Sequence, residues 1–355
     1  MNMNENHCFR LPAEWEPQSG VILIWPHEDT DWRPYLNEIT EVYLQMADAI
    51  TRFEPLLITV RDTEKVHSLL AERLTEGQMK RVTLFACDNN DTWARDVAPI
   101  SLISDKEPKG SLQALRLLDF CFNGWGEKFA AEKDNRINRQ LYEAGLLQGV
   151  LENHKDFVLE GGSIESDGDR TLFTTTGCLM APHRNQPLTQ EEIDKRLRLF
   201  FPNVERVVWL DYGQLAGDDT DGHIDTIVRV APNHTLLYIG YGDKEDEHYE
   251  DFRLLEEQLK QLRTIDGDPY RLLRLPMPDT IYDDGERLPA THANFLIING
   301  AVLVPTYNQP EKDKVALDII QEAFPDREII GIDSRTIIRQ HGSIHCLTMQ
   351  LPLNG

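Results

Sequence analysis

Four short polar clusters, far apart along the chain, hold the side chains best suited to catalysis. The clusters and their candidate residues are "DTWARDVAPI" with Asp96, "VLEGGSIES" with Glu160, "GDDTDGHIDTIV" with His223 and Asp225, and "GSIHC" with Cys346. Singly, each has an ordinary reading: a turn or cap aspartate, a hydrated loop glutamate, a satisfied histidine, a small core cysteine. Together they supply a nucleophile, an acid–base group and anionic groups. Such groups are costly to bury without a function, so we predict that they meet in one catalytic pocket.

Cys346 directly follows His345, which raises the question of whether the two form a catalytic pair. The segment "SIHCLTM" alternates and is predicted to be a strand, in which successive side chains point to opposite faces. His345 would then point away from the sulfur and play a supporting role. His223 is the better candidate base, and if its own segment is extended, His223 and Asp225 share one face.

A zinc site is the alternative use of the same residue types. The residues that offer ligands are His223, Asp225, His292, His345 and Cys346. None has the HExxH or CxxC spacing that is typical of zinc sites. The chain also lacks GxxxxGK followed by Ser or Thr, GxGxxG after a strand, and GxSxG, which disfavours NTPase, dinucleotide-binding and serine-hydrolase functions. We therefore predict neither a metal nor an organic cofactor.

The composition describes a globular, strongly acidic protein. Its 355 residues include 60 acidic and 36 basic side chains, which gives a formal net charge of −24 at pH 7. A basic footprint for nucleic acid or an anionic membrane surface is absent, so neither is a predicted partner. The same charge would attract small cationic molecules.

The cysteines and the apolar runs bear on the compartment. Five cysteines, odd in number and far apart, favour free thiols in a reducing environment over a disulfide framework. The first residues, "MNMNENHCFR", lack the apolar stretch of a signal peptide. The longest apolar runs, such as "GVILIW", have the length of a strand and are too short to cross a bilayer. These features predict a cytoplasmic enzyme.

Apolar patterning predicts alternating strands and helices. Strands are predicted at residues 20–25, 55–60 and 81–87 and in "RVVWLD", "YRLLRLP" and "REIIGID". Hairpins are predicted to turn at Asp167-Gly168, at Pro232-Asn233 and, with a type I′ sequence, at Asn299-Gly300. Amphipathic helices are predicted at residues 40–53, 135–147, 190–201, 249–263 and 313–324.

The order hairpin, helix, strand recurs roughly every 70 residues, without sequence identity between the units. No long Pro-, Gly- or Ser-rich linker divides the chain, so residues 1–355 are predicted to form a single α/β domain of similar modules. A ring of five modules would account for the length. An ordinary open α/β sheet is the alternative.

Seven motifs, taken in order, resemble the agmatine deiminase and bacterial-type (Porphyromonas-type) peptidylarginine deiminase family. They are "LPAEWEPQSGVILIWP", "DTWARDVAPI", "FNGWGEKF", "LEGGSIESDG", "DDTDGHIDT", "LPATHANFLIINGAVLVP" and "GSIHC". The resemblance implies the pentein fold, a five-bladed α/β propeller of ββαβ modules with a central active site. It also implies a hydrolase of the guanidino-group-modifying superfamily that acts on C–N bonds of linear amidines.

The same resemblance implies a role for each cluster. Carried over motif by motif, the nucleophile would be Cys346, the general acid and base His223, the guanidinium ligands Asp96 and Asp225, and the group that orients His223 would be Glu160. Trp93 and Asp219 are further candidates for lining the substrate pocket. The chain departs from many members at "HGSIHC", where they have Gly-Gly-Asn before Ile-His-Cys. His341 and Ser343 therefore put the geometry of the loop before the nucleophile in question.

Agmatine is the predicted substrate, hydrolysed to N-carbamoylputrescine and ammonia through a covalent amidino-cysteine (thiouronium) intermediate, in putrescine biosynthesis. Free or peptidyl arginine, which would give citrulline, is the alternative. That alternative needs a cation for the substrate carboxylate, and the candidates are Arg10, Arg33, Arg95 and Arg184. A silent propeller that binds a partner is a third hypothesis, which the complete residue set disfavours. The expected partner is a small cationic guanidine, and homo-oligomerisation is left open.

Overall fold

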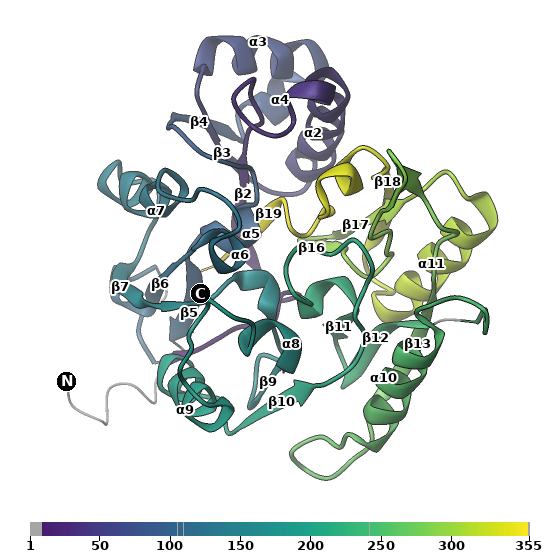
Figure 1. Cartoon of the computed structure of the whole chain (residues 1–355). Coiled ribbons are helices and arrows are strands. Elements are labelled where there is room, and N and C mark those ends of the chain that lie inside the picture. Colours follow the sequence, from purple (N-terminus) through teal and green to yellow (C-terminus); the bar gives the residue numbers. More distant parts are fainter. Residues whose placement is uncertain (1–8, 105, 109, 241, 354–355) are drawn as a thin grey trace.

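The computed structural model describes residues 9–104, 106–108, 110–240 and 242–353. Within these ranges, strands and helices alternate, and most strands belong to five sheets of three or four strands. The longer helices lie on the outside of the molecule and the sheets lie toward its middle (Figure 1). The protein is therefore an α/β protein, as predicted.

Three sheets share one simple order: an antiparallel hairpin, a helix, and a strand added in parallel. The first contains β8 (Ile164–Ser166), β9 (Thr171–Thr175), α9 (Gln190–Phe200) and β10 (Arg206–Leu210). The second contains β11 (Val228–Ala231), β12 (Thr235–Gly240), α10 (Tyr249–Gln261) and β13 (Arg271–Pro276). The third contains β16 (Leu296–Ile298), β17 (Ala301–Thr306), α11 (Pro310–Ala323) and β18 (Glu328–Asp333). The predicted recurrence of hairpin, helix and strand is confirmed.

The other two large sheets extend this pattern by one strand each. One contains β1 (Phe9–Arg10), β5 (Ile100–Ser104), β6 (Leu115–Cys121), α7 (Asp134–Glu143) and β7 (Val150–Val158). The other contains β19 (Thr348–Pro352), β2 (Gln18–Ile24), α2 (Leu36–Thr51), β3 (Leu56–Val60), α3 (Thr63–Arg73), α4 (Glu76–Met79) and β4 (Val82–Ala86). Its β19 pairs antiparallel with β2, so this sheet joins early and late segments of the chain. A two-stranded hairpin, β14 (Tyr282–Asp283) and β15 (Glu286–Arg287), stands apart.

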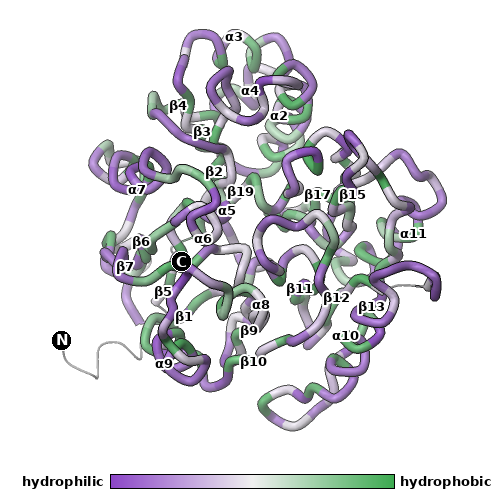
Figure 2. The backbone as a smooth tube through the Cα atoms, viewed as in Figure 1, coloured by the Kyte–Doolittle hydropathy of each residue, from purple (hydrophilic) through white to green (hydrophobic). Residues whose placement is uncertain are grey.

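Capping residues set where the helices begin, and apolar faces set which side of each helix is buried. α9 begins with a capping box, in which Thr189 accepts from the backbone of Glu192 and the Glu192 carboxylate accepts from the backbone of Thr189. α10 buries Phe252, Leu255 and Leu259, whose spacing of three and four residues places them on one face. Hydrophobic residues recur along strands and helices, whereas the outer loops are mostly hydrophilic (Figure 2).

The three predicted hairpins form, but one turn differs from its prediction. Asn299-Gly300 joins β16 to β17 as a two-residue loop, and of the two only Gly300 has a positive φ, 77°. A type I′ turn needs a positive φ at both positions, so that part of the prediction is wrong. Asn299 is held instead by Gln18, whose backbone N–H and C=O bond its side chain at 3.1 and 2.8 Å.

The structure bears on two further predictions, that the cysteines are free thiols and that the apolar runs are too short to cross a membrane. The cysteines in the described ranges, Cys87, Cys121, Cys178 and Cys346, are all free, and Cys8 lies outside those ranges. Within the same ranges, the longest and most apolar helices fall short of what a membrane span needs.

Candidate active site

Cys346 lies in a turn rather than in the predicted strand. Residues 344–347 form the turn, and β19 begins only at Thr348, whose backbone N–H donates to the carbonyl of His345 (3.1 Å). Asn294 holds the turn from outside. Its carbonyl accepts from His345 N (3.2 Å), and its side-chain oxygen accepts from Cys346 N (3.3 Å). These bonds close the turn, so the strand prediction is wrong before Thr348.

The thiol of Cys346 is buried among acceptors and negative charge. Its sulfur lies 3.3 Å from Asn294 Oδ1 and 3.7 Å from Asp225 Oδ2. Burial, together with the charges of Asp225 and Asp96, raises the pKa of the Cys346 thiol well above its usual value. The thiol of the free protein is therefore uncharged at neutral pH. A cation bound beside the two carboxylates would remove much of this effect.

His223 is fully buried and directly precedes a short 3-10 helix, η4 (Ile224–Thr226), so the condition that its segment be extended through Asp225 is not met. Its Nδ1 lies 3.7 Å from Asp96 Oδ1. Neither ring nitrogen has a hydrogen-bond partner among the residues that the structure describes. Burial favours the neutral ring, but the charges of Asp96 and Cys178 outweigh it and raise the pKa of His223 well above its usual value. His223 is therefore ready to donate a proton.

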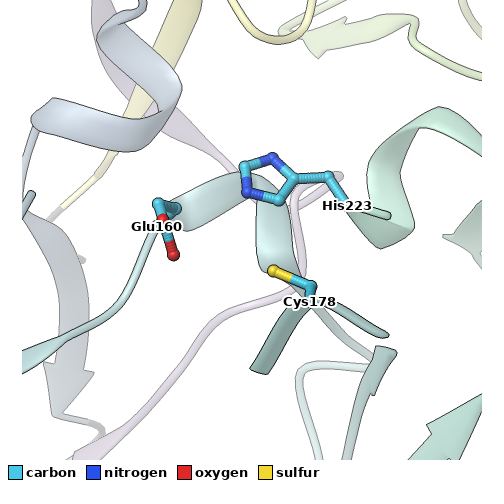
Figure 3. Close-up of side chains that lie close together, drawn as sticks. All are labelled: Glu160, Cys178 and His223. Carbon is cyan, nitrogen blue, oxygen red and sulfur yellow. The ribbon is translucent and has the colours of Figure 1, made fainter. Parts of the chain in front are cut away.

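Glu160 and Cys178 face one side of the His223 ring (Figure 3). One polar atom from each of the three residues lies within 4.8 Å of the others. Glu160 directly precedes η3 (Gly161–Ser163), and Cys178 belongs to α8 (Thr176–Leu179). Glu160 Oε1 accepts from Arg184 Nε (2.9 Å), which fixes the carboxylate beside the ring. Sequence reasoning missed Cys178, because a lone cysteine in an apolar segment carries no local signal.

Asp96 lies on α5 (Ala94–Val97), and both of its oxygens are occupied. Oδ1 accepts from Gly162 N (3.1 Å) and Oδ2 accepts from Trp125 Nε1 (3.0 Å). Gly162 is needed for this contact, because a Cβ there would lie 2.6 Å from His223 Nδ1 and 3.0 Å from Asp96 Oδ1. The absence of a side chain at Gly162 thus lets the backbone after Glu160 lie close to both His223 and Asp96.

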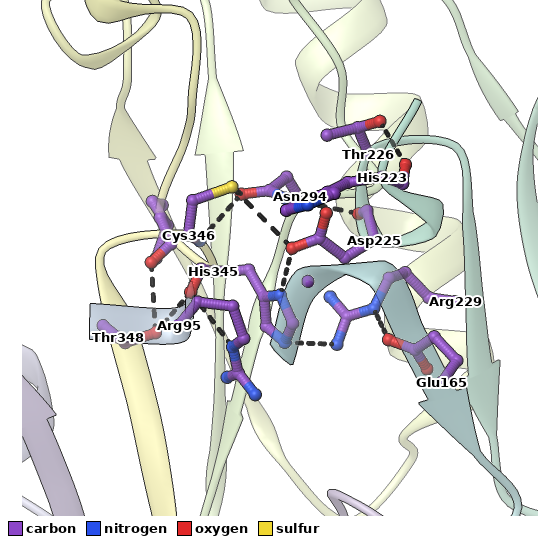
Figure 4. Close-up of polar contacts among 12 residues, drawn as sticks. Arg95, Glu165, His223, Asp225, Thr226, Arg229, Asn294, His345, Cys346 and Thr348 are labelled. Carbon is purple, nitrogen blue, oxygen red and sulfur yellow. Dashed lines mark hydrogen bonds and ion pairs between the residues drawn. The ribbon is translucent and has the colours of Figure 1, made fainter. Parts of the chain in front are cut away.

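Asp225 is fully buried within η4 (Figure 4). Its Oδ2 accepts from His345 Nδ1 (2.6 Å), while its Oδ1 has no partner in the described part of the chain. Burial would raise the pKa of Asp225, but the hydrogen bond and charge of His345 lower it below its usual value. An ionised carboxylate with one unused oxygen is suited to a cationic N–H donor.

The sulfur of Cys346 borders a cavity of about 130 Å³. The lining residues are Asp31, Asp91, Trp93, Asp96, Trp125, Phe129, Asp219, Thr220, Gln340, His341, Gly342 and Cys346. Trp93 and Asp219, which were candidates from the sequence, are thus both at the cavity. Trp93 also packs edge-on against Trp125, with ring centroids 6.4 Å apart. Among the described lining residues there are four aspartates and neither lysine nor arginine.

The two unusual loop residues before Ile344 occupy different positions. His341 has a positive φ of 65°, lines the cavity and bonds the carbonyl of Gly217 through Nδ1 (2.7 Å). The hydroxyl of Ser343 is buried and has no partner among the described residues. With His341 and Ser343 in this loop, Cys346 still borders the cavity. Of the two residues, His341 is the one that lines the cavity.

The five-residue zinc set does not form one cluster. His292 is bonded elsewhere, to Asp313 Oδ1 and to the carbonyl of Pro276, each at 3.1 Å. His345 directs both ring nitrogens away from the thiol, one to Asp225 and one to Glu14. The supporting role predicted for His345 therefore agrees with its contacts, although the strand used to argue for it does not exist.

The raised pKa of Cys346 predicts how the thiol reacts in the free protein. Alkylation by iodoacetamide should be slow at pH 7 and should accelerate about tenfold per pH unit toward alkaline pH, because only the thiolate reacts. Peptide mapping by mass spectrometry assigns the rate to Cys346 and separates it from the other cysteines. Fast alkylation of Cys346 that is constant between pH 6 and pH 8 would contradict the electrostatics described above.

Comparisons with known proteins show the family to which the chain belongs. The sequence profile of the Porphyromonas-type peptidyl-arginine deiminase family matches residues 10–352. An agmatine deiminase from Pseudomonas aeruginosa is 32% identical over 97% of this chain and 95% of its own. A solved structure from Porphyromonas gingivalis, provisionally named an arginine deiminase, is 47% identical over 98% of this chain and 99% of its own, with a TM-score of 0.90. A substrate-bound agmatine deiminase from C. jejuni is 34% identical over 98% of this chain and 97% of its own, with a TM-score of 0.88. The chain therefore belongs to the Porphyromonas-type peptidyl-arginine deiminase family.

Proposed function

We propose that the protein hydrolyses agmatine to N-carbamoylputrescine and ammonia, with Cys346 as the nucleophile. The observation that carries this proposal is the lining of the cavity beside the thiol, which includes four aspartates and no described lysine or arginine. Burial raises the pKa of Asp96 and, to about 7, that of Asp91, so a bound cation would favour their charged forms. Agmatine presents a guanidinium at one end and an amine at the other, and it has no carboxylate. The relatives named agmatine deiminase, at 32% and 34% identity over nearly the whole chain, support the same choice.

In the first half-reaction, Asp96 and Asp225 bind the guanidinium through charge-assisted hydrogen bonds and fix its plane. The bound cation offsets the negative field at Cys346, so the thiol loses its proton to solvent with the substrate in place; this is the proton that the released ammonia takes up as ammonium. The sulfur then attacks the guanidinium carbon and forms a neutral tetrahedral adduct. His223 donates its proton to one NH₂ group, the C–N bond breaks, and ammonia leaves.

The second half-reaction hydrolyses the covalent thiouronium. His223, now neutral, takes a proton from a water molecule as its oxygen attacks the same carbon. The C–S bond breaks, the hydroxyl proton returns to the sulfur, and the ureido product leaves. Glu160 stabilises the charged form of His223 in both halves, because its carboxylate is fixed beside the ring.

Arginine fits the cavity less well, because its carboxylate finds no described cation in the lining. Three of the candidate arginines are already paired: Arg10 with Glu16, Arg95 with Glu14, and Arg184 with both Glu160 and Asp221. The fourth, Arg33, is exposed on η1 (Arg33–Tyr35) and does not line the cavity. An unpaired buried carboxylate would cost binding energy.

We also propose that the five large sheets are the blades of a pentein five-bladed propeller, in a single domain that spans residues 1–355. The shared order of antiparallel pair and added parallel strand supports this arrangement. So does the origin of the site, whose residues come from segments hundreds of residues apart. A cytoplasmic enzyme without a nucleic-acid partner or cofactor is the setting that the sequence predicts.

The proposal is tested by incubating the protein separately with agmatine, free arginine and a peptide with C-terminal arginine, and by measuring ammonia and the ureido products. We expect N-carbamoylputrescine from agmatine, with kcat/KM at least about 100-fold above that for arginine, because the arginine carboxylate stays unpaired. Citrulline formation at an equal or higher kcat/KM would assign the arginine alternative. No product from any guanidine would favour the partner-binding hypothesis.

A further inference from the structure

A buried chain of hydrogen bonds leads from Asp225 away from the substrate cavity. His345, fully buried, lies between two carboxylates: its Nδ1 is 2.6 Å from Asp225 Oδ2 and its Nε2 is 2.8 Å from Glu14 Oε1. Figure 4 shows the imidazole below the thiol, with its two nitrogens turned toward Asp225 and Arg229. Carboxylate oxygens only accept, so Nδ1 donates to Asp225, and Nε2 donates to Glu14 if it carries a proton. Arg229 Nη2, which only donates, also lies 3.0 Å from Nε2, so the charges of the surrounding groups decide the state of that nitrogen.

The charges around His345 favour a proton on both ring nitrogens. The buried cluster contains three carboxylates, Glu14, Glu165 and Asp225, and two guanidiniums, Arg95 and Arg229. With all three carboxylates ionised, the cluster is electrically neutral if His345 carries the third positive charge. A neutral cluster is what a buried site of low dielectric favours.

Glu14 is the fixed end of this chain. It lies in the loop between β1 and β2, and besides His345 it accepts from Arg95 Nη1 (2.9 Å), Arg229 Nη2 (2.6 Å) and Gln350 Nε2 (3.1 Å). Burial alone would raise the pKa of Glu14, but His345 and the two arginines lower it well below its usual value. Four donors thus hold one ionised carboxylate in place.

The far end of the chain reaches a different part of the surface. Glu14 and Arg95 line a second cavity, of about 80 Å³, which shares no lining residue with the cavity beside Cys346. Arg95 also donates to the carbonyl of His345 (3.4 Å), and its backbone N–H donates to the carbonyl of Cys346 (3.1 Å). The same cluster therefore supports both Asp225 and the turn that carries the nucleophile.

We propose that His345 is a positioning residue, held as an imidazolium between Glu14 and Asp225, that fixes the orientation and charge of the Asp225 carboxylate for a guanidinium substrate. His345 occupies Oδ2 of Asp225 and leaves Oδ1, which is buried and without a described partner, as the acceptor for the substrate. Glu14 keeps the proton on His345, so a residue on the far side of the cluster influences Asp225, whose Oδ2 lies 3.7 Å from the sulfur of Cys346. The kinetic part of this proposal rests on the proposed deimination.

The test is Glu14→Gln, which keeps the shape of the side chain but removes the charge opposite His345. Histidine-selective nitrogen NMR of the full chain at neutral pH reports the ring directly: we expect an imidazolium in the wild type and a neutral ring in Glu14→Gln. We further expect kcat/KM for agmatine to fall on the order of ten- to hundredfold, mainly through KM, with Glu14→Asp recovering part of the loss.

Glu16→Gln is the matched control, because Glu16 lies two residues away and pairs with Arg10 and the backbone of Ala13 rather than with His345. It should leave the kinetics and the NMR signal unchanged. A neutral His345 in the wild type would overturn the proposal, as would unchanged kinetics in Glu14→Gln. If Glu14→Gln lowered only kcat, and by no more than the fraction of protein that is unfolded, the role of Glu14 would be structural. That result would also overturn the proposal. Because the NMR needs no substrate, it decides the ring's state even if no guanidine is hydrolysed.

Discussion

Replacing Cys346 with alanine should abolish ammonia release from agmatine while substrate binding survives. Among the described residues that line the cavity, Cys346 is the one thiol, and loss of such a nucleophile lowers kcat by at least about 10,000-fold in other enzymes. The cationic substrate is bound by carboxylates that the substitution leaves in place. Ammonia release and isothermal titration calorimetry with agmatine measure the two halves of this expectation.

Cys121→Ser is the matched control, since Cys121 ends β6, is only partly buried and does not line the cavity beside Cys346. It should retain turnover close to that of the unmodified protein. Undiminished activity in Cys346→Ala would rule out covalent catalysis by this residue. Loss of activity together with loss of binding would place Cys346 in substrate binding instead.

Replacing Asp96 with asparagine should lower kcat/KM for agmatine by two to three orders of magnitude, since breaking a buried ion pair costs roughly 3–5 kcal/mol. The same change should move the pH profile. Asp96 is the main cause that raises the pKa of His223, so its loss lowers that pKa. The acid form of His223 is then lost at a lower pH, and the alkaline limb of kcat/KM shifts toward lower pH. Steady-state kinetics between pH 5 and pH 10 measure both effects.

Asp156→Asn makes the same change in net charge on the exposed side of β7, where Asp156 pairs only with Arg196 among the described residues. Its pH profile should match that of the unmodified protein. An Asp96→Asn variant whose kcat/KM and alkaline limb are both unchanged would remove Asp96 from substrate binding and from the tuning of His223.

The sequence predicted the regular elements well, because their signals are local. The apolar face of α10 and the capping box of α9 each lie within one short segment, and both helices match their predicted ranges to within two residues. Turn residues such as Asp-Gly, Pro-Asn and Asn-Gly placed the hairpins for the same reason. The type I′ turn failed at Asn299 because the deciding partner, Gln18, lies far away in sequence.

The site also separates what local sequence signals predict from what long-range contacts decide. Residue type alone pointed to Asp96, His223 and Cys346, and the structure places all three in one buried cluster. The backbone conformation was predicted wrongly for Cys346, which sits in a turn held by Asn294 from another segment. Cys178 and Glu14 were missed because neither has a neighbour in sequence that marks it.

The pairing of β19 with β2 also bears on how the protein folds. The two strands are more than 300 residues apart in sequence. The sheet that contains β2 therefore stays incomplete until almost all of the chain has been synthesised. Closing such a long loop is entropically costly and slow compared with forming a local hairpin. Cys346 lies two residues before β19 and reaches its place only when that strand docks. The place of the nucleophile therefore depends on a pairing between the two ends of the chain.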